Sequence, residues 1–417
     1  MATDGDDLLI GTEGPDTLSG LGGNDVLLGL GGNDTLRGGE GDDTLNGGTG
    51  RDVARGGNGN DTYFVDQAND QVIESSNAGY DKVYASVSYT LGDNVENLYF
   101  LGNGNIDGVG NSEHNYIEGN AGNNRIDGKG GDDFLIGGDG DDRLFGGSGH
   151  DVLYAGAGID TLNGGSGDDW FYDLDVNDVL IEIAGGGHDT AEVYAAAANS
   201  TYHLGANVED LFISGQQNLI AHGNNAGNQI FISSNGGTAY GEGGNDDIFA
   251  QTSETLYGGN GNDTLRGNSN FANNLYGEAG RDYFTLADTM DTASGGSGRD
   301  SFEFLWGNGT DRSEMVRHVA DFDAGAGERI IFMDRSNLMD EIPFGTVANK
   351  YFYAGDGAGA VAQTADHHYI YDRLSGELYY DSNGNGIGGT TLIGDIQLAA
   401  GQLSASNLFK ADAWGED

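Results

Sequence analysis

The sequence lacks cysteine and is poor in proline. Its 417 residues contain no Cys, 2 Pro and 77 Gly. Without cysteine, disulfide bonds and thiol chemistry are excluded. Glycine is present at more than twice its average share of about 7%. Collagen also has abundant glycine, but it needs proline and a three-residue period, so a collagen-like fold is excluded.

Positive charge is scarce as well. The chain carries 17 Lys and Arg against 67 Asp and Glu, which gives a formal net charge of −50. Contacts to nucleic-acid phosphates need clustered Lys and Arg, so nucleic-acid binding is excluded. Electrostatic docking on an anionic membrane surface is disfavoured for the same reason.

Long hydrophobic runs are absent too. No apolar stretch approaches the roughly 20 residues of a transmembrane helix. The first residues, Met1–Asp7, are acidic and lack the apolar centre of an N-terminal export signal. We therefore expect a chain without a transmembrane segment that is either cytosolic or exported by a route that does not read its N-terminus.

What the sequence does have is a nine-residue repeat. Asp recurs every nine residues, with Gly two positions before it and an apolar residue two positions after it, as in Gly38-Gly-Glu-Gly-Asp-Asp-Thr-Leu-Asn46. The aspartates of this first block are Asp7, Asp16, Asp25, Asp34, Asp43, Asp52 and Asp61. The matching glycines are Gly5, Gly14, Gly23, Gly32, Gly41, Gly50 and Gly59.

Two further blocks follow the same pattern. The second contains Asn115, Asn124, Asp133, Asp142, Asp151, Asp160 and Asp169, and its glycines are Gly131, Gly140, Gly149, Gly158 and Gly167. Asn replaces Asp in its first two loops, so we expect weaker ligands there. The third block is irregular, with copies at Asp246, Asp263, Asp282 and Asp300. The unequal spacings between these four aspartates indicate small insertions and deletions.

The repeat predicts an all-β fold. So much glycine is incompatible with a helix, but it permits the left-handed backbone angles of a tight loop. The remaining three residues, with an apolar residue in the middle, suffice for one short strand. Two nonapeptides, with their two loops and two strands, then close one coil, and alternate apolar side chains fill the space between two parallel sheets. We predict a parallel β-roll or β-helix solenoid of Gly-Asp-rich nonapeptides, with β-rich spacers and a β-rich C-terminal cap.

Apolar burial alone does not stabilise such a coil. One Leu per repeat contributes roughly 2 kcal/mol, whereas ordering nine residues costs on the order of 10 kcal/mol. Stacked rows of Asp also repel one another, and a divalent cation between the loops would reverse the sign of that term. The available donors are carboxylate and carbonyl oxygens, which favour Ca²⁺ over zinc or copper and over the stricter octahedron of magnesium. We therefore predict that several calcium ions are part of the fold.

These repeats resemble the glycine- and aspartate-rich nonapeptides of the RTX, or haemolysin-type, family of secreted calcium-binding proteins. The resemblance implies that each ion lies between loops i and i+18, held by carbonyls of the Gly segment and by Asp carboxylates. Asp16 would then pair with Asp34, and Asp25 with Asp43. The candidate metal ligands are the aspartates from Asp16 to Asp61 and from Asp133 to Asp169, the glycines Gly23–Gly59 and Gly131–Gly167 of the same series, and Asp246, Asp263, Asp282 and Asp300. The alternative, a disordered acidic linker, would not keep an apolar residue in register with each Asp.

Segments poorer in glycine separate the blocks. Val72-Ile-Glu74 recurs as Leu180-Ile-Glu182, a whole number of nonapeptides further along the chain, and both segments alternate as strands do. We interpret them as broader β-coils that continue the solenoid, with flexible linkers as the alternative. The predicted organisation is 1–64 first calcium β-roll, 65–110 spacer, 111–172 second β-roll, 173–222 spacer, 223–305 degenerate third β-roll, and 306–417 C-terminal cap and secretion region.

The C-terminal region resembles other parts of RTX proteins. Val319-Ala-Asp-Phe-Asp323 is similar to the stretch that ends the roll in secreted RTX proteases, and Tyr369-Ile-Tyr-Asp372 is similar to the C-terminal segment of many RTX proteins. The resemblance implies a cap and an export signal for a type I transporter. Asp381, Asn383, Asn385 and Gly386 match the start of an EF-hand loop, but Leu392 stands where the bidentate Glu belongs. A polar turn is therefore the better interpretation, with an additional loose calcium site as the alternative. The pair His367-His368 has no third ligand that we can place.

No catalytic motif accompanies the repeats. The sequence contains no His-Glu-x-x-His, no Gly-x-Ser-x-Gly and no Walker motif. We therefore predict a secreted calcium-binding protein with a structural, adhesive or interaction role, for which a cell-surface or matrix polysaccharide is a candidate partner. The alternative is an extracellular enzyme acting on polysaccharide, with a site in the spacers or the C-terminal region.

Overall fold

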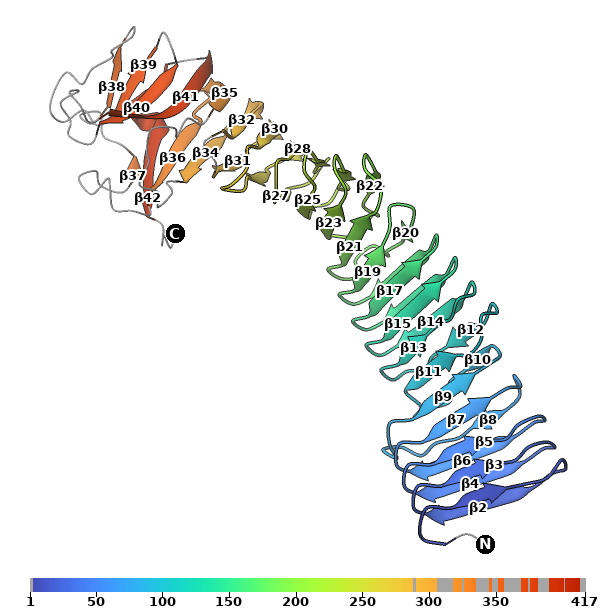
Figure 1. The fold of residues 1–417 in the computed structure, drawn as a ribbon. Coiled ribbons are helices and arrows are strands. Elements are labelled where there is room, and N and C mark those ends of the chain that lie inside the picture. Colours follow the sequence, from blue (N-terminus) through green and yellow to red (C-terminus); the bar gives the residue numbers. More distant parts are fainter. Residues whose placement is uncertain are drawn as a thin grey trace. The chain divides into compact units, whose positions relative to one another are not determined.

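The computed structural model describes residues 3–287, 290–305, 318–324, 326–334, 345–346, 352–355, 369–373, 376–381, 390–400 and 402–412. The chain divides into two compact units, Met1–Val193 and Tyr194–Asp417, and Figure 1 labels the strands of both. Apart from one 3-10 turn, Ala405–Asn407, the regular structure of the described residues is β-strand. No helix of the described part is long and apolar enough to cross a membrane.

Unit 1 is a stack of β-coils with a parallel sheet on each side. One side consists of β1 (Leu8–Ile10), β3 (Val26–Leu28), β5 (Thr44–Asn46), β7 (Thr62–Val65), β9 (Lys82–Ala85), β11 (Asn97–Phe100), β13 (Tyr116–Glu118), β15 (Phe134–Asp139), β17 (Val152–Ala157), β19 (Trp170–Leu174) and β21 (Thr190–Ala195). The other side has two sheets. They are β2 (Thr17–Gly22), β4 (Thr35–Glu40), β6 (Val53–Asn58) and β8 (Gln71–Val72), then β10 (Tyr89–Thr90), β12 (Asp107–Val109), β14 (Arg125–Gly130), β16 (Arg143–Ser148), β18 (Thr161–Ser166) and β20 (Val179–Leu180).

The strand register confirms that two nonapeptides form one coil. Leu9 pairs with Leu27 and Leu27 with Leu45, so each residue lies beside the one two repeats further on. The first spacer continues the same parallel sheet with coils of different length. Thr62 pairs with Lys82 across a longer coil, and Lys82 pairs with Asn97 across a shorter one. The spacer therefore forms β-coils, as the alternation of its residues predicted.

The apolar residues of the repeats form the core, although Leu9, Leu18 and Ala54 at this position are only half-buried. Leu27, Leu36 and Leu45 are at most 1% exposed, and the corresponding side chains of the second block are fully buried. The buried residues of the second block are Ile117, Ile126, Leu135, Leu144, Leu153, Leu162 and Phe171. Each strand contributes one such residue between the sheets, so the interior is a narrow column of stacked side chains.

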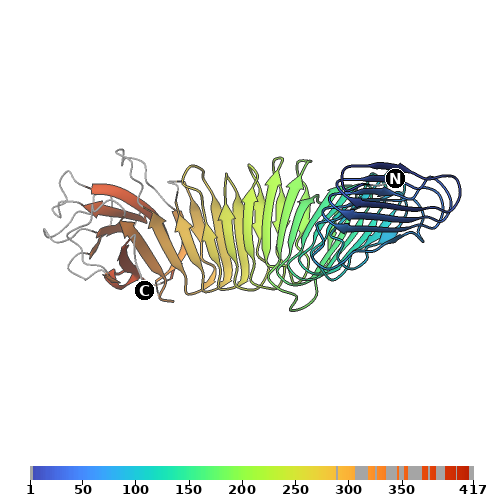
Figure 2. The ribbon, with the colours of Figure 1, turned by 90° about the horizontal axis from the view of Figure 1, so that it is seen from below.

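Unit 2 repeats this arrangement with coils of unequal length (Figure 2). One side consists of β23 (Asp210–Gly215), β25 (Gln229–Ser233), β27 (Asp247–Ala250), β29 (Thr264–Arg266), β31 (Tyr283–Leu286), β34 (Ser301–Leu305), β36 (Arg329–Asp334), β42 (Leu408–Asp412) and β37 (Gly345–Thr346). The other side consists of β22 (Thr201–His203), β24 (Ile220–His222), β26 (Thr238–Tyr240), β28 (Thr255–Gly261), β30 (Asn274–Gly280), β33 (Ser297–Gly298), β32 (Thr292–Ser294), β35 (His318–Asp323), β41 (Thr390–Ala400), β40 (Glu377–Asp381), β39 (Tyr369–Asp372) and β38 (Phe352–Gly355).

The register of unit 2 accounts for the irregular third block. Asp247 pairs with Thr264 across a coil that is one residue shorter than two nonapeptides, and Thr264 pairs with Tyr283 across one that is one residue longer. The insertions and deletions therefore lie in the loops of intact coils. Beyond the last repeat, β41 pairs in parallel with β35, and β42 pairs in parallel with β36.

Antiparallel pairing appears only in this last region of the described chain, between β39 and β40, β40 and β41, and β37 and β42. His367, His368 and most of the EF-hand-like segment, 382–389, lie outside the described residues.

Candidate metal centre

The loops that precede the strands bring the aspartates of successive coils together. We call the buried carboxylate of each repeat its core Asp. The backbone N–H of Asp25 donates to Oδ1 of Asp43 (2.8 Å), and that of Asp43 to Oδ1 of Asp61 (2.7 Å). Asp133 and Asp151 are joined in the same way at 2.8 Å, and Asp282 and Asp300 at 2.9 Å. One carboxylate oxygen of each core Asp thus holds the preceding coil, and loops at i and i+18 are neighbours.

The glycines two residues before each core Asp form the tight part of the loop. Gly41 has φ of 113°, in the left-handed region that a side chain disfavours. A Cβ on Gly41 would also lie 2.4 Å from the carbonyl oxygen of Gly23, one coil below. The other glycines predicted as metal ligands all have positive φ: Gly23, Gly32, Gly50, Gly59, Gly131, Gly140, Gly149, Gly158 and Gly167. They let the loops stack closely, which places loop carbonyls over one another.

The second oxygen of the core Asp has no hydrogen-bond partner in this stack. Asp34 and Asp43 are each 1% exposed, yet their Oδ2 atoms are buried and unpartnered. The core aspartates with such an oxygen are Asp25, Asp34, Asp43, Asp52, Asp61, Asp81, Asp133, Asp142, Asp151, Asp160, Asp169, Asp246, Asp263, Asp282 and Asp300. A buried, unpaired carboxylate oxygen is strongly unfavourable without a positive partner.

Each unpartnered oxygen, except those of Asp81 and Asp160, lies beside a second glycine, five residues before the core Asp, which we call the cradle glycine; Ser76 and Ala155 take its place before Asp81 and Asp160. A Cβ on the cradle glycine Gly38 would lie 2.0 Å from Oδ2 of Asp43 and 2.7 Å from the carbonyl oxygen of Gly56 in the next coil. Gly146 stands in the same relation to Asp151 and to the carbonyl oxygen of Gly164. The cradle is therefore a small space lined by carboxylate and carbonyl oxygens, the donor set that calcium prefers.

Wherever the core Asp has an unpartnered oxygen, the residue four positions before it has a left-handed backbone conformation, with positive φ. Gly39 precedes Asp43 in this way, and Leu21 precedes Asp25 with φ of 83°. Where this residue is not left-handed, its N–H closes the loop instead. Oδ2 of Asp16 accepts the N–H of Thr12 (2.6 Å) and its hydroxyl (2.8 Å). Of the predicted metal ligands, Asp16 is thus the one whose carboxylate is already satisfied by its own loop.

The loops with Asn show which charge belongs in the cradle. Oδ1 of Asn124 accepts the N–H of Asn120 (2.9 Å), and Nδ2 of Asn124 donates to the carbonyl of Ile106 (2.9 Å). Asn115 forms the equivalent bonds to Asn111 and to the carbonyl of Val95. An amide therefore satisfies these loops with its own N–H groups, whereas a carboxylate at the same place needs a cation.

Burial also makes several of the core carboxylates hard to ionise. It raises the pKa of Asp133 to about 8; the N–H of Asn115 works in the opposite direction, and the charge of Asp151 raises the pKa further. Burial likewise raises the pKa of Asp61 to about 8 and that of Asp142 to about 7. A divalent cation in the cradles would remove this resistance, because it compensates both burial and repulsion between neighbouring Asp.

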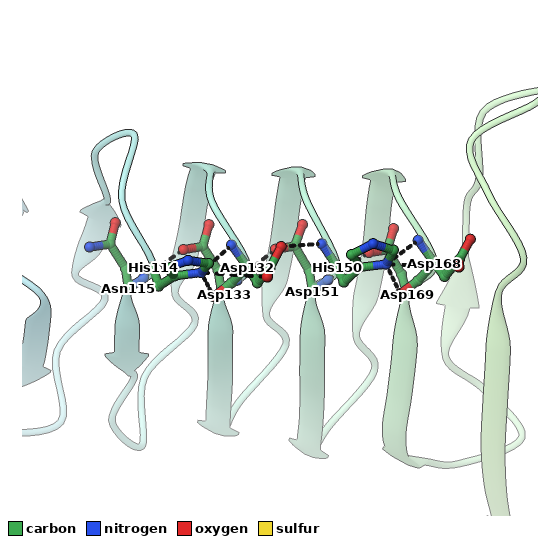
Figure 3. Close-up of polar contacts among 8 residues, drawn as sticks. All are labelled: His114, Asn115, Asp132, Asp133, His150, Asp151, Asp168 and Asp169. Carbon is green, nitrogen blue, oxygen red and sulfur yellow. Dashed lines mark hydrogen bonds and ion pairs between the residues drawn. The ribbon is translucent and has the colours of Figure 1, made fainter.

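A second row of side chains runs along the outside of the loops, one residue before the core Asp. The N–H of Asp132 donates to Nδ1 of His114 (2.7 Å), and the N–H of His150 donates to Oδ1 of Asp132 (2.8 Å), as Figure 3 shows. These side chains accept from the following coil, whereas the core Asp accepts from the preceding one. Sequence reasoning missed this outer row and the cradle glycines, although both recur every nine residues.

Comparison with known proteins gives a consistent result. A family model described as the RTX calcium-binding nonapeptide repeat, in four copies, matches residues 1–36, 37–72, 109–144 and 145–180. It also matches the irregular block in three overlapping segments, 250–270, 257–288 and 269–302. None of the curated proteins searched matches the chain.

Proposed function

Because the chain belongs to the RTX calcium-binding nonapeptide-repeat family, we propose that it is a secreted structural protein whose β-rolls fold when extracellular calcium fills their cradles. The repeats are calcium-binding motifs and the fold is an all-β parallel solenoid. The observation that carries the proposal is the row of buried, unpartnered Oδ2 atoms of the core Asp, which recurs in all three blocks.

We assign the ions to the cradles between successive coils. Inside a block, the unpartnered Oδ2 of a core Asp and the backbone carbonyl at the cradle position one coil further on offer oxygen ligands, as for Asp43 and Gly56. The loops of Asn115, Asn124 and Asp16 are weaker candidates, because their side chains are satisfied within the protein.

Calcium supply explains why folding and location are linked. Extracellular calcium modules bind at about 10⁻⁴–10⁻³ M, well above cytosolic free calcium. Inside a cell the net charge of −50 would keep the chain expanded by self-repulsion, which suits passage through a narrow channel. Outside, binding free energy adds to folding free energy, so folding would make export one-way.

We further propose that a type I transporter reads the C-terminal region. Expression of the full chain and of a chain ending at Lys350 in the native host tests this. The full chain should reach the medium and the shortened one should not. Equal export of both, or of neither, would contradict the proposal.

A structural and adhesive role is supported by the surface of the coils. Rings stack along the outer faces of the sheets, as in Phe64–Tyr84 (centroids 5.5 Å apart) in unit 1 and Phe212–Phe231 (4.6 Å) in unit 2. Such rows reinforce the coil stack. The outer edges of these stacked rings lie beside acidic loops. We therefore propose cell-surface or matrix polysaccharide as the class of partner. Retention of the calcium-loaded protein on immobilised acidic polysaccharide tests this, and no retention at any calcium concentration would contradict it.

A further inference from the structure

The first nonapeptide block ends at a cluster that differs from the cradles within it. In a regular coil, position i+13 from a core Asp is a cradle glycine, as Gly56 is for Asp43. For the last core Asp of this block, Asp61, that position holds Glu74. Asp61, Glu74 and Asp81 each have a carboxylate oxygen in this cluster, and the three oxygens lie within 4.8 Å of one another. A third carboxylate therefore replaces a neutral carbonyl.

Hydrogen bonds fix this extra carboxylate in the cradle. Oε1 of Glu74 accepts the N–H of the cradle glycine Gly56 (3.0 Å) and the hydroxyl of Tyr63. Asp81 takes the place of the next core Asp, since its Oδ1 accepts the N–H of Asp61 (2.7 Å). Three carboxylates so close repel one another strongly unless a cation lies among them.

Two unpartnered atoms point independently to a ligand here. Asp61 is 0% exposed and Asp81 is 1% exposed, and Oδ2 of each is buried without a hydrogen-bond partner. The amide hydrogen bonds of Glu74 explain its own position but leave both of these oxygens uncompensated.

Related residues close the other two blocks, although among the described residues only the three carboxylates of the first block lie within 4.8 Å of one another. Glu182 stands at position i+13 from Asp169, as Glu74 does from Asp61, and it accepts the N–H groups of Gly164 and Gly165. In unit 2, Oδ1 of Asp321 accepts the N–H of Gly295 (2.8 Å) and Oδ2 that of Gly296 (2.9 Å), although the coil is longer. In each case a buried acid follows at the same short interval, where the next core Asp belongs: Asp81 after Glu74, Asp189 after Glu182, and Glu328 after Asp321.

We propose that each nonapeptide block is closed at its C-terminal end by a calcium site with three carboxylates, and that these sites fill before the cradles inside the blocks. The proposal rests on the proposed function, namely that the cradles take calcium. The three sites are Asp61–Glu74–Asp81, Asp169–Glu182–Asp189 and Asp300–Asp321–Glu328. An added negative ligand tightens a calcium site, because affinity follows ligand charge. The closing sites would then anchor the end of each roll at calcium concentrations too low to fill its interior.

Competition between the full-length protein and a chromophoric calcium chelator tests the proposal. Glu74→Gln keeps an oxygen for the N–H of Gly56 but removes the charge. The number of ions in the class of tightest binding sites should then fall by one, because the affinity of this site for calcium should be lower by at least about tenfold. Glu182→Gln should remove a second ion from that class, and the double variant both. Glu192→Gln, an exposed glutamate of unit 1, is the matched control and should bind as the unchanged protein does.

The outcomes separate this proposal from the proposed function. If the unchanged protein binds no calcium, the proposed function fails. If the unchanged protein binds calcium and both Gln variants have the same calcium-binding isotherm as the unchanged protein, the closing sites are refuted while the proposed function stands.

A second measurement avoids any change to the carboxylates. Tyr63 is next to Glu74, and Phe171 takes the equivalent place in the second block, so Tyr63→Phe should fold normally. Terbium in the first closing site would be excited through Tyr63. Emission over the first equivalents of terbium should therefore fall in Tyr63→Phe. Unchanged early emission would overturn the assignment of a tight ion to this site.

Discussion

Substitution of the cradle glycine Gly146 by alanine should remove bound calcium without straining the backbone. Gly146 does not have a left-handed φ, so alanine is compatible with its conformation. Its Cβ would, however, lie 2.3 Å from Oδ2 of Asp151 and 2.6 Å from the carbonyl oxygen of Gly164. Both contacts are shorter than non-bonded atoms tolerate, so the methyl group would occupy the space that we assign to the ion. By the same reasoning, the cradle of Asp160, where Ala155 already supplies a methyl group, should bind calcium less well than that of Asp151.

The size of the effect depends on calcium. An ion that binds only the folded state stabilises it by about 2.7 kcal/mol at 100 times its Kd and about 4.1 kcal/mol at 1,000 times. The loss for Gly146→Ala should therefore grow by about 1.4 kcal/mol for every tenfold rise in calcium and for every ion lost. A purely steric cost would be the same at all calcium concentrations.

Denaturant unfolding at several calcium concentrations measures this slope. Gly104→Ala is the control, because a Cβ there meets nothing within 4 Å. The control should follow the unchanged protein throughout. A constant difference between Gly146→Ala and the unchanged protein would refute the reasoning, because the glycine would then serve packing alone.

Three further predictions follow from the site. In EGTA, β-structure should increase as the pH falls from 8 to 4.5. Burial raises the pKa of Asp61 and Asp133 from 3.8 to about 8, so in this pH range the folded state binds protons that the unfolded state has released. Circular dichroism that shows loss of structure on acidification would contradict this. Asp34→Ala should lower the number of calcium ions bound, as measured by calorimetry, because the loop of Asp34 faces two coils. Asp107→Ala, at an exposed aspartate, should leave that number unchanged. Equal effects of the two variants would refute the i, i+18 pairing. Asn124→Asp should destabilise the calcium-free protein, because it removes the amide hydrogen bond to Ile106; unchanged acid-induced β-structure in EGTA would count against it.

The repeat predicts the coil because both depend on local spacing. A nine-residue period with one apolar residue per copy determines which side chains face inward, and Leu27, Leu36 and Leu45 are buried accordingly. The pairing of Asp25 with Asp43 follows from the same arithmetic, since two nonapeptides close one coil.

The details of the cradle could not be predicted in this way. Whether a carboxylate such as that of Asp16 is satisfied depends on the direction of one backbone N–H, which the left-handed residue four positions earlier decides. Leu21 and Lys129 adopt that conformation without being glycine, so composition does not reveal it. The acidic residues of the closing sites could not be found from the nine-residue spacing either, because Asp321 bonds to Gly295 across a coil whose length differs from that of the others.

The dependence of the fold on calcium is the central claim, and far-ultraviolet circular dichroism of the full-length protein tests it most directly. In EGTA the chain should be largely disordered, and millimolar calcium should produce a cooperative gain of β-structure that equal magnesium does not. A β-spectrum already complete in EGTA, and unchanged by calcium, would contradict the account.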